Sequence, residues 1–397
     1  MKTTTLLFIS LTATAILTMT GCTADIPTVS LGIDDSYYIE RMRKLPLHPA
    51  LTGREYRWTL TRPGGSADVV SQERDYIFMQ AEEGKYHVRL DIIDPDSPYS
   101  HEFTVTVMHE EVEYSPYISR VYEYCPAPGQ FVNEMPRYEE GDGYADILQK
   151  AEESISGTND IMITLGGYGG YVTFGFDHTV VNVPGEADFR IWGNCFYELT
   201  NPDRKGGSAE PGIVMVSYDS NCNGLPDDEW YELKGSDYGN PATRTNYSVT
   251  YFRPSAPKMN VEWVDSEGKT GIVKYLPLVH KQDYYYPAWI TEPSYTLYGT
   301  CIPAANSVDP STGYWNNSPY AWGYADNVGS DNIGGLSADG TGQATGFKLS
   351  NAVFADGSAI DLKYVDFVKV QVAVLAQSGG LGEISTEVSG FIDYSMR

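Results

Sequence analysis

The sequence predicts an all-β protein, with a small β-sandwich followed by a larger jelly-roll-type β-sandwich that carries one short helix. Three observations predict this class. The 397-residue chain contains 31 Tyr, 39 Gly and 23 Pro, a composition typical of strands joined by many turns. Short runs of alternating apolar and polar residues recur along it. No self-similarity at a propeller period of about 40–45 residues occurs, which favours sandwiches.

An apolar leader precedes the predicted domains. Lys2 supplies a basic start, residues 6–19 carry no charge, and Cys22 follows a Gly. This run is shorter than the ~20 residues that cross a bilayer, and its layout is that of a secretion signal. Its end resembles the lipobox of bacterial lipoproteins, which implies a lipidated Cys as the first mature residue. We therefore expect a signal peptide over 1–21 and a lipidated tether over 22–36, anchored in the outer membrane and facing the cell surface. A plain signal with an incidental Cys is the alternative.

Residues 37–112 are expected to form the small sandwich. Alternation of apolar and polar residues predicts strands at Tyr56–Leu60, Tyr86–Ile92 and Phe103–Val107. The Tyr-Arg-Trp start of the first strand and the Gly-Lys-Tyr-His-Val run into the second resemble PKD-type immunoglobulin-like domains, although the Gly-Asp-Gly turn of that family is missing. The resemblance implies a spacer.

The next segment, 113–142, is rich in Tyr, Pro and acids and is expected to be a linker or an entry segment of the second domain. A helix is predicted over Tyr144–Ser154, with Asp142 as its cap. Its apolar positions share one face, and they are Ile147, Leu148, Ala151 and Ile155.

Residues 143–397 are expected to form the large ligand-binding sandwich, with the binding surface in loops at one rim. The β-type runs in it are 161–165, 171–176, 179–183, 188–192, 212–218, 230–233, 247–252, 261–264 and 364–374. The Gly-rich run 166–170 lies between two of them and is expected to be a tight turn.

The net charge and the absence of catalytic motifs disfavour two classes of function, nucleic-acid binding and catalysis. With 53 acidic and 27 basic residues the formal net charge is -26, which disfavours nucleic acid, because phosphate contacts need a basic face. The sequence contains no G-x-S-x-G elbow, no H-E-x-x-H pair and no phosphate-binding Gly loop, so no enzyme is predicted, although an unrecognised acid pair stays open. Four cysteines besides Cys22 leave disulfides and free thiols equally open, namely Cys125, Cys195, Cys222 and Cys301.

One acidic loop predicts a calcium site. In the run that begins at Asp219, oxygen-bearing side chains alternate and are followed by Gly224, as in the first half of an EF-hand loop. Trp230 stands where that loop has its last Glu, and the flanking segments are strand-like. We expect a structural calcium clamp in a hairpin; the alternative is an Asn/Gly-rich turn that binds nothing. The predicted ligand residues are Asp219, Asn221, Asn223, Leu225, Asp227 and Asp228.

Aromatic residues gather in two late segments, 284–289 and 314–324. Rings with polar tips suit flat or sugar-like ligands. The first segment fits a core strand equally well, whereas Gly, Asn and Pro make the second a loop. The ligand-binding residues predicted there are Tyr314, Trp315, Asn316, Tyr320, Trp322 and Tyr324.

The C-terminal two thirds resemble a family of cell-surface lipoproteins of gut Gram-negative anaerobes, which often carry a PKD-like front domain and accompany outer-membrane corrinoid (vitamin B12) uptake systems. The motifs that carry the resemblance are 169–178, 188–194, 210–217, 219–233, 323–327, 365–370 and 382–387.

Three functions follow as hypotheses. The first, implied by the resemblance, is a noncatalytic accessory lipoprotein that captures a corrinoid for an outer-membrane transporter. The second keeps the architecture but binds glycans for a polysaccharide-utilisation system, on Tyr314, Trp315 and Trp322. The third is a hydrolase with an unrecognised acid pair.

Overall fold

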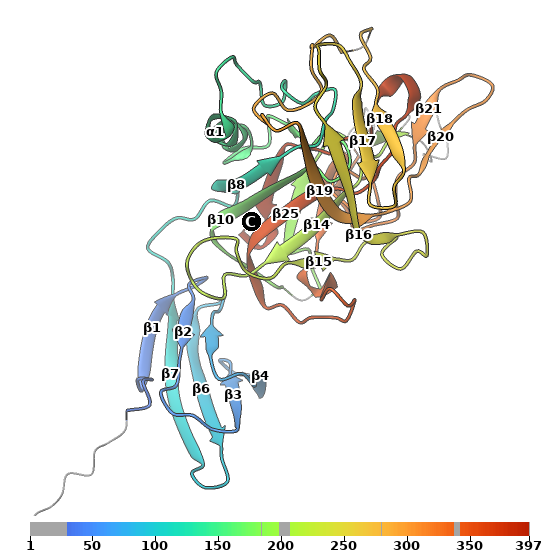
Figure 1. The fold of residues 1–397 in the computed structure, drawn as a ribbon. Helices are drawn as coiled ribbons and strands as arrows, with labels where there is room; N and C mark the ends of the chain where they lie inside the picture. The colour runs from blue at the N-terminus through green and yellow to red at the C-terminus, as the bar shows by residue number, and fades with distance from the viewer. Residues whose placement is uncertain (1–29, 184, 198–206, 279, 337–341, 397) are drawn as a thin grey trace, which may run out of the picture. The chain divides into compact units, whose positions relative to one another are not determined.

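The computed structural model describes residues 30–183, 185–197, 207–278, 280–336 and 342–396, so Cys22 and the predicted signal peptide lie outside the described residues. The chain divides into two compact units. One comprises Met1–Tyr37, Pro46–Ile77 and Tyr86–Val105, and the other comprises Tyr38–Leu45, Phe78–Lys85 and Thr106–Arg397. The predicted all-β class is confirmed, because strands in several sheets make up the described chain and α1 is its one α-helix (Figure 1). Every helix in the described part is too short or too polar to cross a bilayer.

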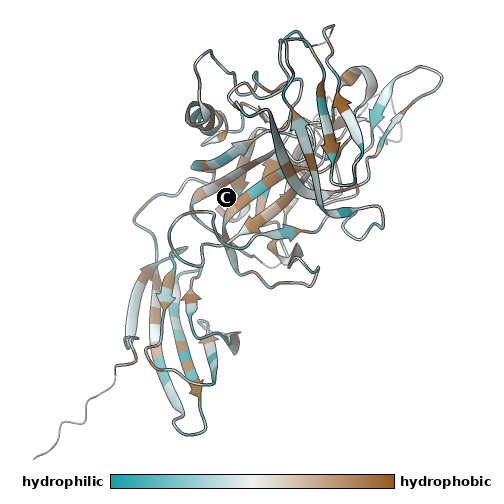
Figure 2. Ribbon diagram, in the orientation of Figure 1, coloured by the Kyte–Doolittle hydropathy of each residue, from teal (hydrophilic) through white to brown (hydrophobic). Residues whose placement is uncertain are grey.

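The N-terminal strands form a five-stranded sheet in the order β1-β7-β6-β3-β4 and a two-stranded sheet of β2 and β5. The predicted alternation is confirmed: Trp58, Leu60, Val88 and Leu90 are buried, and Figure 2 shows hydrophobic and hydrophilic bands along these strands. The indole of Trp58 donates a 3.0 Å hydrogen bond to the carbonyl of Glu73. The strands are β1 (Ser36–Glu40), β2 (Leu45–Leu47), β3 (Glu55–Thr61), β4 (Ala67–Ser71), β5 (Tyr76–Phe78), β6 (Gly84–Ile93) and β7 (Tyr99–Met108).

A six-stranded antiparallel sheet in the order β24-β15-β14-β25-β10-β8 lies at the centre of the second unit. The segment predicted as a linker or entry segment contributes its edge strand β8. The two strands predicted over 171–183 are one strand, β10, with an irregular register between Gly175 and Val180. The strands are β8 (Arg120–Cys125), β10 (Tyr171–Val181), β14 (Gly212–Ser217), β15 (Tyr231–Leu233), β24 (Ala352–Val353) and β25 (Tyr364–Val372).

A second sheet, β22-β23-β11-β27, shares a hydrophobic core with this one. Phe174 of β10 meets Phe391 of β27 with ring centroids 3.7 Å apart, and Val214 and Val370 pack in the same core as Phe189. Two apolar faces packed in this way make a β-sandwich. The strands are β11 (Phe189–Trp192), β22 (Asn332–Leu336), β23 (Gly342–Phe347) and β27 (Gly390–Asp393).

Three smaller sheets complete the unit, in the orders β12-β13-β21-β20, β18-β17-β16-β19 and β26-β9. Their strands are β9 (Ile163–Thr164), β12 (Phe196–Tyr197), β13 (Gly207–Ser208), β16 (Arg244–Phe252), β17 (Val261–Asp265), β18 (Thr270–Val273), β19 (Ser294–Cys301), β20 (Asn306–Val308), β21 (Trp315–Asn317) and β26 (Glu387–Val388). Short 3-10 turns occur at Leu349–Asn351, Gly379–Leu381 and Tyr394–Met396. The predicted Gly-rich turn is confirmed by Gly166, where φ is +67° and an added Cβ would lie 1.9 Å from the Ala127 carbonyl oxygen.

The predicted helix is α1 (Tyr144–Ile155), which lies beside β8 (Figure 1). Its buried face contains the predicted Ile147, Ala151 and Ile155. The predicted cap is wrong, because Gly143 occupies the N-cap position and donates its N–H to the carboxylate of Asp146 at 2.8 Å. The carboxylate of Asp142 instead accepts the N–H of Glu139 and forms an ion pair with Lys150.

Candidate functional site

The predicted aromatic residues divide by exposure. Tyr314 immediately precedes β21 in the β20–β21 hairpin and is 78% exposed, and Trp322 is 37% exposed. Trp315 is half-buried on β21. Tyr320 and Tyr324 are buried at 7% and 1% exposure and pack in one hydrophobic cluster. Three of the six residues therefore present aromatic surface to solvent.

Hydrogen bonds show what the remaining members of this set do. The hydroxyl of Tyr320 donates to the carbonyl of Pro303 at 2.7 Å, and the hydroxyl of Tyr324 accepts the N–H of Asp237 at 3.1 Å. The amide oxygen of Asn316 accepts the N–H of Gly207, which joins β13 to β21. These side chains hold the frame of the aromatic segment.

Other exposed aromatic residues escaped the sequence prediction, and two of them lie on neighbouring strands. Tyr298 on β19 is 68% exposed and Phe252 on β16 is 40% exposed. Tyr298 pairs with Ser248, and Thr250 and Thr296 lie between the two rings with their hydroxyls 2.8 Å apart. The alternation in β16 was visible, but it did not show which face would be covered. In the segment 284–289, by contrast, Tyr285, Tyr286 and Trp289 are buried in cores.

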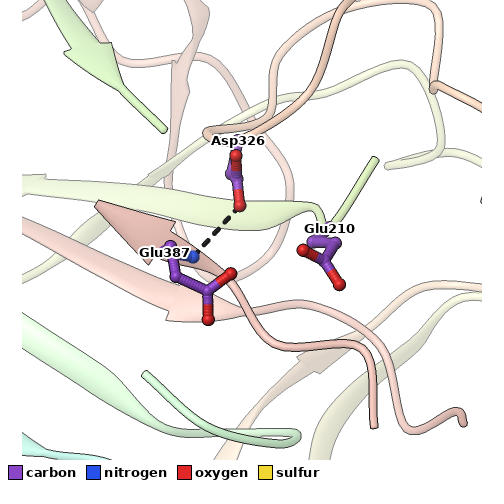
Figure 3. A group of neighbouring side chains, drawn as sticks. All are labelled: Glu210, Asp326 and Glu387. Atoms are coloured by element: carbon purple, nitrogen blue, oxygen red, sulfur yellow. Dashed lines mark hydrogen bonds between the residues drawn. The ribbon is translucent and has the colours of Figure 1, made fainter. Parts of the chain in front are cut away.

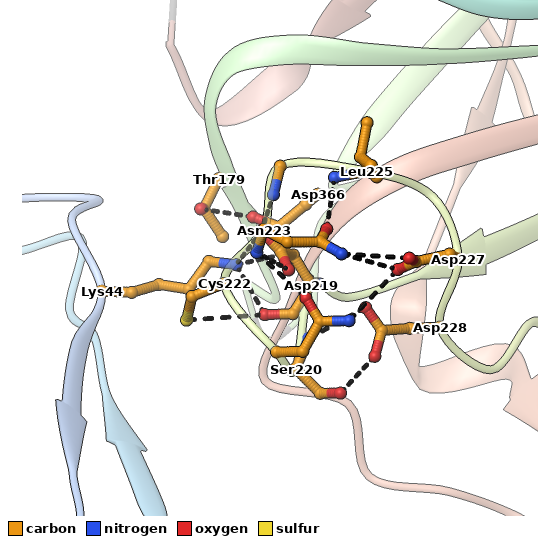
Figure 4. A network of polar contacts seen from close by, with 12 residues as sticks. Lys44, Thr179, Asp219, Ser220, Cys222, Asn223, Leu225, Asp227, Asp228 and Asp366 are labelled. Carbon is orange, nitrogen blue, oxygen red and sulfur yellow. Dashed lines mark hydrogen bonds and ion pairs between the residues drawn. The ribbon is translucent and has the colours of Figure 1, made fainter.

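The predicted calcium loop is a compact turn between β14 and β15 (Figure 4). Asp219 is 7% exposed, and its two carboxylate oxygens accept the backbone N–H groups of Asn223 and Gly224 at 3.0 and 2.9 Å. Cys222 and Gly224 have φ of 57° and 75°, so two residues of the turn are in the left-handed region. The loop is thus ordered by its own backbone donors around Asp219.

The outer side of the same loop carries the other predicted ligands. The amide groups of Asn221 and Asn223 donate to the Asp227 carboxylate at 3.1 and 3.0 Å, and Asp228 accepts the N–H of Ser220 at 3.2 Å. These bonds lower the pKa of Asp227. Leu225 is exposed. The loop therefore carries carboxylate and amide groups of the kind that a hard cation prefers, but in the described residues the carboxylates of Asp219, Asp227 and Asp228 do not converge on one point.

A second group of carboxylates, which the sequence did not single out, lies inside the large unit. Glu210, Asp326 and Glu387 come from separate segments and converge, with one oxygen of each within 4.8 Å of the others (Figure 3). Asp326 and Glu387 are 1% and 2% exposed, and Glu210 is half-buried as a residue. Within the described residues, no other set of three or more acidic, His or Cys side chains meets in this way.

Backbone donors place Asp326. Its Oδ1 accepts the N–H groups of Asn194 and Cys195, both at 2.8 Å, and its Oδ2 accepts the N–H of Glu387 at 3.0 Å. A Cβ on Gly193 would lie 2.2 Å from Oδ1, so the close approach requires glycine there.

Side-chain donors place Glu387. Its Oε1 accepts the hydroxyls of Thr164 and Ser385 at 2.9 and 2.7 Å, and its Oε2 accepts the Asn194 amide at 3.3 Å. Nearby Glu383, 5% exposed, accepts the N–H of Gln130 at 2.6 Å through Oε1, while its Oε2 has no partner.

Burial disfavours ionisation throughout this cluster. It raises the pKa of Asp326 to about 8 and that of Glu383 to about 7, and the charge of Glu387 adds to both shifts. Burial, followed by the charges of Glu387 and Asp326, raises the pKa of Glu210 well above its usual range. A hollow beside Asp326 measures about 160 Å³ with open solvent included, which is below the ~300 Å³ of small ligand pockets.

A buried histidine also lies inside the large unit. The His178 side chain is fully buried, and its two ring nitrogens lie 2.8 and 2.9 Å from carboxylate oxygens of Asp177 and Asp393. All four described cysteines are free, and Cys222 is the exposed one.

Comparisons with known proteins leave the family open. No family model and no curated protein matches the chain. Among solved structures it is similar to a SusE-like protein, at 9% identity over 90% of this chain and 95% of that one, with a TM-score of 0.23. It is also similar to a chain described under "Structural basis for the promiscuous specificity of the carbohydrate-binding modules from the beta-sandwich super family", at 9% identity, 85% and 93% coverage and a TM-score of 0.15. Likenesses at this level define neither a family nor a ligand.

Proposed function

We propose that the protein is a noncatalytic, lipid-anchored binding protein of the cell surface that holds neutral sugar chains on exposed aromatic side chains. One observation carries the proposal: the Tyr314 ring stands 78% exposed next to Trp315. An aromatic ring with a polar tip offers sugars a stacking face and a hydrogen-bonding group. A neutral ligand suits a chain of net charge -26, which repels anions.

The hairpin that carries Tyr314 is ordered by its own hydrogen bonds. The N–H of Asp309 donates to the carbonyl of Tyr314, and the N–H of Gly313 donates to the carbonyl of Asp309, both at 2.8 Å. Trp315 lies against Gly379, where an added Cβ would come within 2.1 Å of the indole nitrogen. A ligand would therefore meet rings that are already held in place, which lowers the entropic cost of binding.

A titration of the soluble Cys22→Ala protein with neutral oligosaccharides tests the proposal. We expect Tyr314→Ala to weaken glycan binding by about fivefold, because one stacked ring contributes on the order of 1 kcal/mol and 1.4 kcal/mol is a factor of ten. Tyr38→Ala is the matched control, since Tyr38 on β1 is 69% exposed and belongs to no predicted site.

Two results contradict the proposal. One is a wild-type protein that binds no sugar of the panel. The other is equal binding by the Tyr314→Ala and Tyr38→Ala proteins. Cobalamin is titrated alongside, and a cobalamin response that Tyr314→Ala abolishes would replace the sugar by a corrinoid as the ligand.

The location is part of the proposal and has its own test. If Cys22 carries the lipid, the Cys22→Ala protein leaves the membrane fraction and keeps the melting temperature of the mature protein, because the anchor precedes both folded units. Membrane retention of the variant, measured by fractionation, contradicts the anchor. We also propose that the Asp219–Asp228 loop binds calcium as a structural clamp, as its donor set supports.

A further inference from the structure

We propose that Glu210, Asp326 and Glu387 bind a divalent cation of the calcium type between their carboxylates, inside the large sandwich. This site is separate from the Asp219 loop and from the exposed aromatic residues. It would brace the segments that meet there, which are the chain before β14, the 320s loop and β26.

The spacing of the oxygens fits such an ion. Calcium holds oxygen ligands at about 2.3–2.6 Å, so two ligands on opposite sides of it stand about 4.6–5.2 Å apart. The three carboxylates each offer an oxygen within 4.8 Å of the others. Asp326 Oδ2 accepts the N–H of Glu387, and Glu387 Oε2 accepts the Asn194 amide, while a side-chain hydrogen bond links Glu387 to Glu210. In the calcium-bound protein the ion would take the place of the proton in that last bond.

Asn194 supplies a neutral candidate ligand. Its amide Nδ2 lies 3.3 Å from Glu387 Oε2, which is long for a hydrogen bond to a carboxylate and close to the separation of adjacent calcium ligands. A half-turn of the amide would exchange Nδ2 for Oδ1 at this position.

Glu383 is an independent indication of a ligand. It is 5% exposed, and within the described residues its Oε2 has no hydrogen-bond partner. Glu383 and Glu387 lie in the same segment, 382–387, and the hydroxyl of Ser385 between them donates to Glu387. An orphaned buried oxygen is costly, and a cation, or water bound to one, would satisfy it.

Charge balance points the same way. Three carboxyl groups meet in the cluster, and a fourth, that of Glu383, is buried in the same segment as Glu387; no Lys, Arg or His in the described part of the chain is an ion-pair partner of any of them. Buried carboxylates are rarely left unpaired, because isolated charges are expensive in a low dielectric. Shared protons are the competing solution, and the experiment separates the two.

The experiment counts bound metal and measures affinity. Calcium and magnesium are quantified in acid-denatured protein by mass spectrometry, so that an ion which resists a chelator is still counted. Calcium titrations with chelator-treated protein compare the wild type with two variants. Glu210→Gln keeps the shape of the cluster and removes one charge. Asp227→Asn does the same in the exposed loop and is the matched control.

We expect Glu210→Gln to raise the Kd of the buried site by at least about tenfold, while Asp227→Asn leaves that site unchanged. In chelator, Glu210→Gln should melt no lower than the wild type, because burial already favours the neutral form of Glu210 and Gln is a neutral group of the same shape, and this shows that the variant is folded. Wild-type protein without bound divalent metal and without a calcium response overturns the proposal. So does a calcium response that Asp227→Asn abolishes and Glu210→Gln leaves intact.

Discussion

The Asp219–Asp228 loop and the buried carboxylate cluster are built from the same residue types and behave in opposite ways. In the loop, Asp227 is exposed and its pKa is lowered by Asn223 and Asn221. In the cluster, burial raises the pKa of Asp326 to about 8. In the loop, water and nearby amide donors stabilise the ionised carboxylate. In the cluster, the low dielectric of the interior destabilises the ionised form. The comparison teaches that the surroundings of an acid, and not its presence in a motif, decide its charge and its role.

The largest expected effect is on the buried side of this comparison. Asp326→Ala leaves the N–H groups of Asn194, Cys195 and Glu387 without their acceptor. Each unsatisfied buried donor costs about 1–3 kcal/mol, so we expect a loss of at least about 3 kcal/mol in the free energy of unfolding. Urea denaturation in chelator measures it without any contribution from metal.

Asp227→Ala is the matched change on the exposed side. It removes a carboxylate whose described contacts are the amides of Asn221 and Asn223, so the urea midpoint in chelator should stay near that of the wild type. Equal losses of unfolding free energy in the Asp326→Ala and Asp227→Ala proteins would show that burial does not decide how much each carboxylate contributes to stability.

The Asp219–Asp228 loop could be predicted from the sequence, whereas the buried carboxylate cluster could not, and the reason is physical. The loop residues are neighbours in the chain, so their spacing alone indicated a cation-type turn. Glu210, Asp326 and Glu387 lie in separate motifs of the family resemblance, and only the tertiary packing of these distant segments brings them together. Local alternation similarly identified the strands of the N-terminal sheet, because burial there follows the period of a strand.

The aromatic segment shows the same limit. Tyr314 and Tyr324 lie in one Gly- and Asn-rich stretch, and the sequence did not show which of them would be exposed. The first is exposed in a hairpin and the second packs against Tyr320 with ring centroids 5.3 Å apart. Exposure depends on what covers a residue, and distant parts of the chain supply that cover. The prediction of Asp142 as the helix cap was wrong for a similar reason. The Asp142 carboxylate accepts hydrogen bonds from Lys150 and from the N–H of Glu139, and not from the first turn of the helix.

A smaller effect is expected at Glu232, which lies on β15 only a few residues beyond the exposed loop. Burial raises the pKa of Glu232, and the Thr300 hydroxyl, which donates to it at 2.7 Å, partly opposes the shift. Because the folded-state pKa lies above the unfolded value of about 4.3, the folded protein binds this proton more tightly. Its contribution to stability is full below that value and is lost as the pH rises through the folded-state pKa.

Glu232→Gln removes this titration and keeps an acceptor for Thr300. We expect the unfolding free energy of the wild type to fall more steeply between pH 5 and 8 than that of the variant, as measured by urea denaturation in chelator across this range. Other buried carboxyls titrate in both proteins, so only the difference between the curves reports on Glu232. Parallel curves would mean that Glu232 is solvated like the loop acids.

The smallest expected effect is that of calcium on the exposed loop, and it is cleanest in the Glu210→Gln protein, where the buried site is weakened. An ion that binds only the folded state stabilises it by RT ln(1 + [L]/Kd), so calcium should still raise the melting temperature of this variant. Adding Asp227→Asn should remove most of that rise without changing the melting temperature in chelator, because Asp227 is exposed. If calcium does not move the melting temperature of the Glu210→Gln protein, the loop is an Asn- and Gly-rich turn ordered by the carboxylate of Asp219 alone, and metal binding belongs to the buried side.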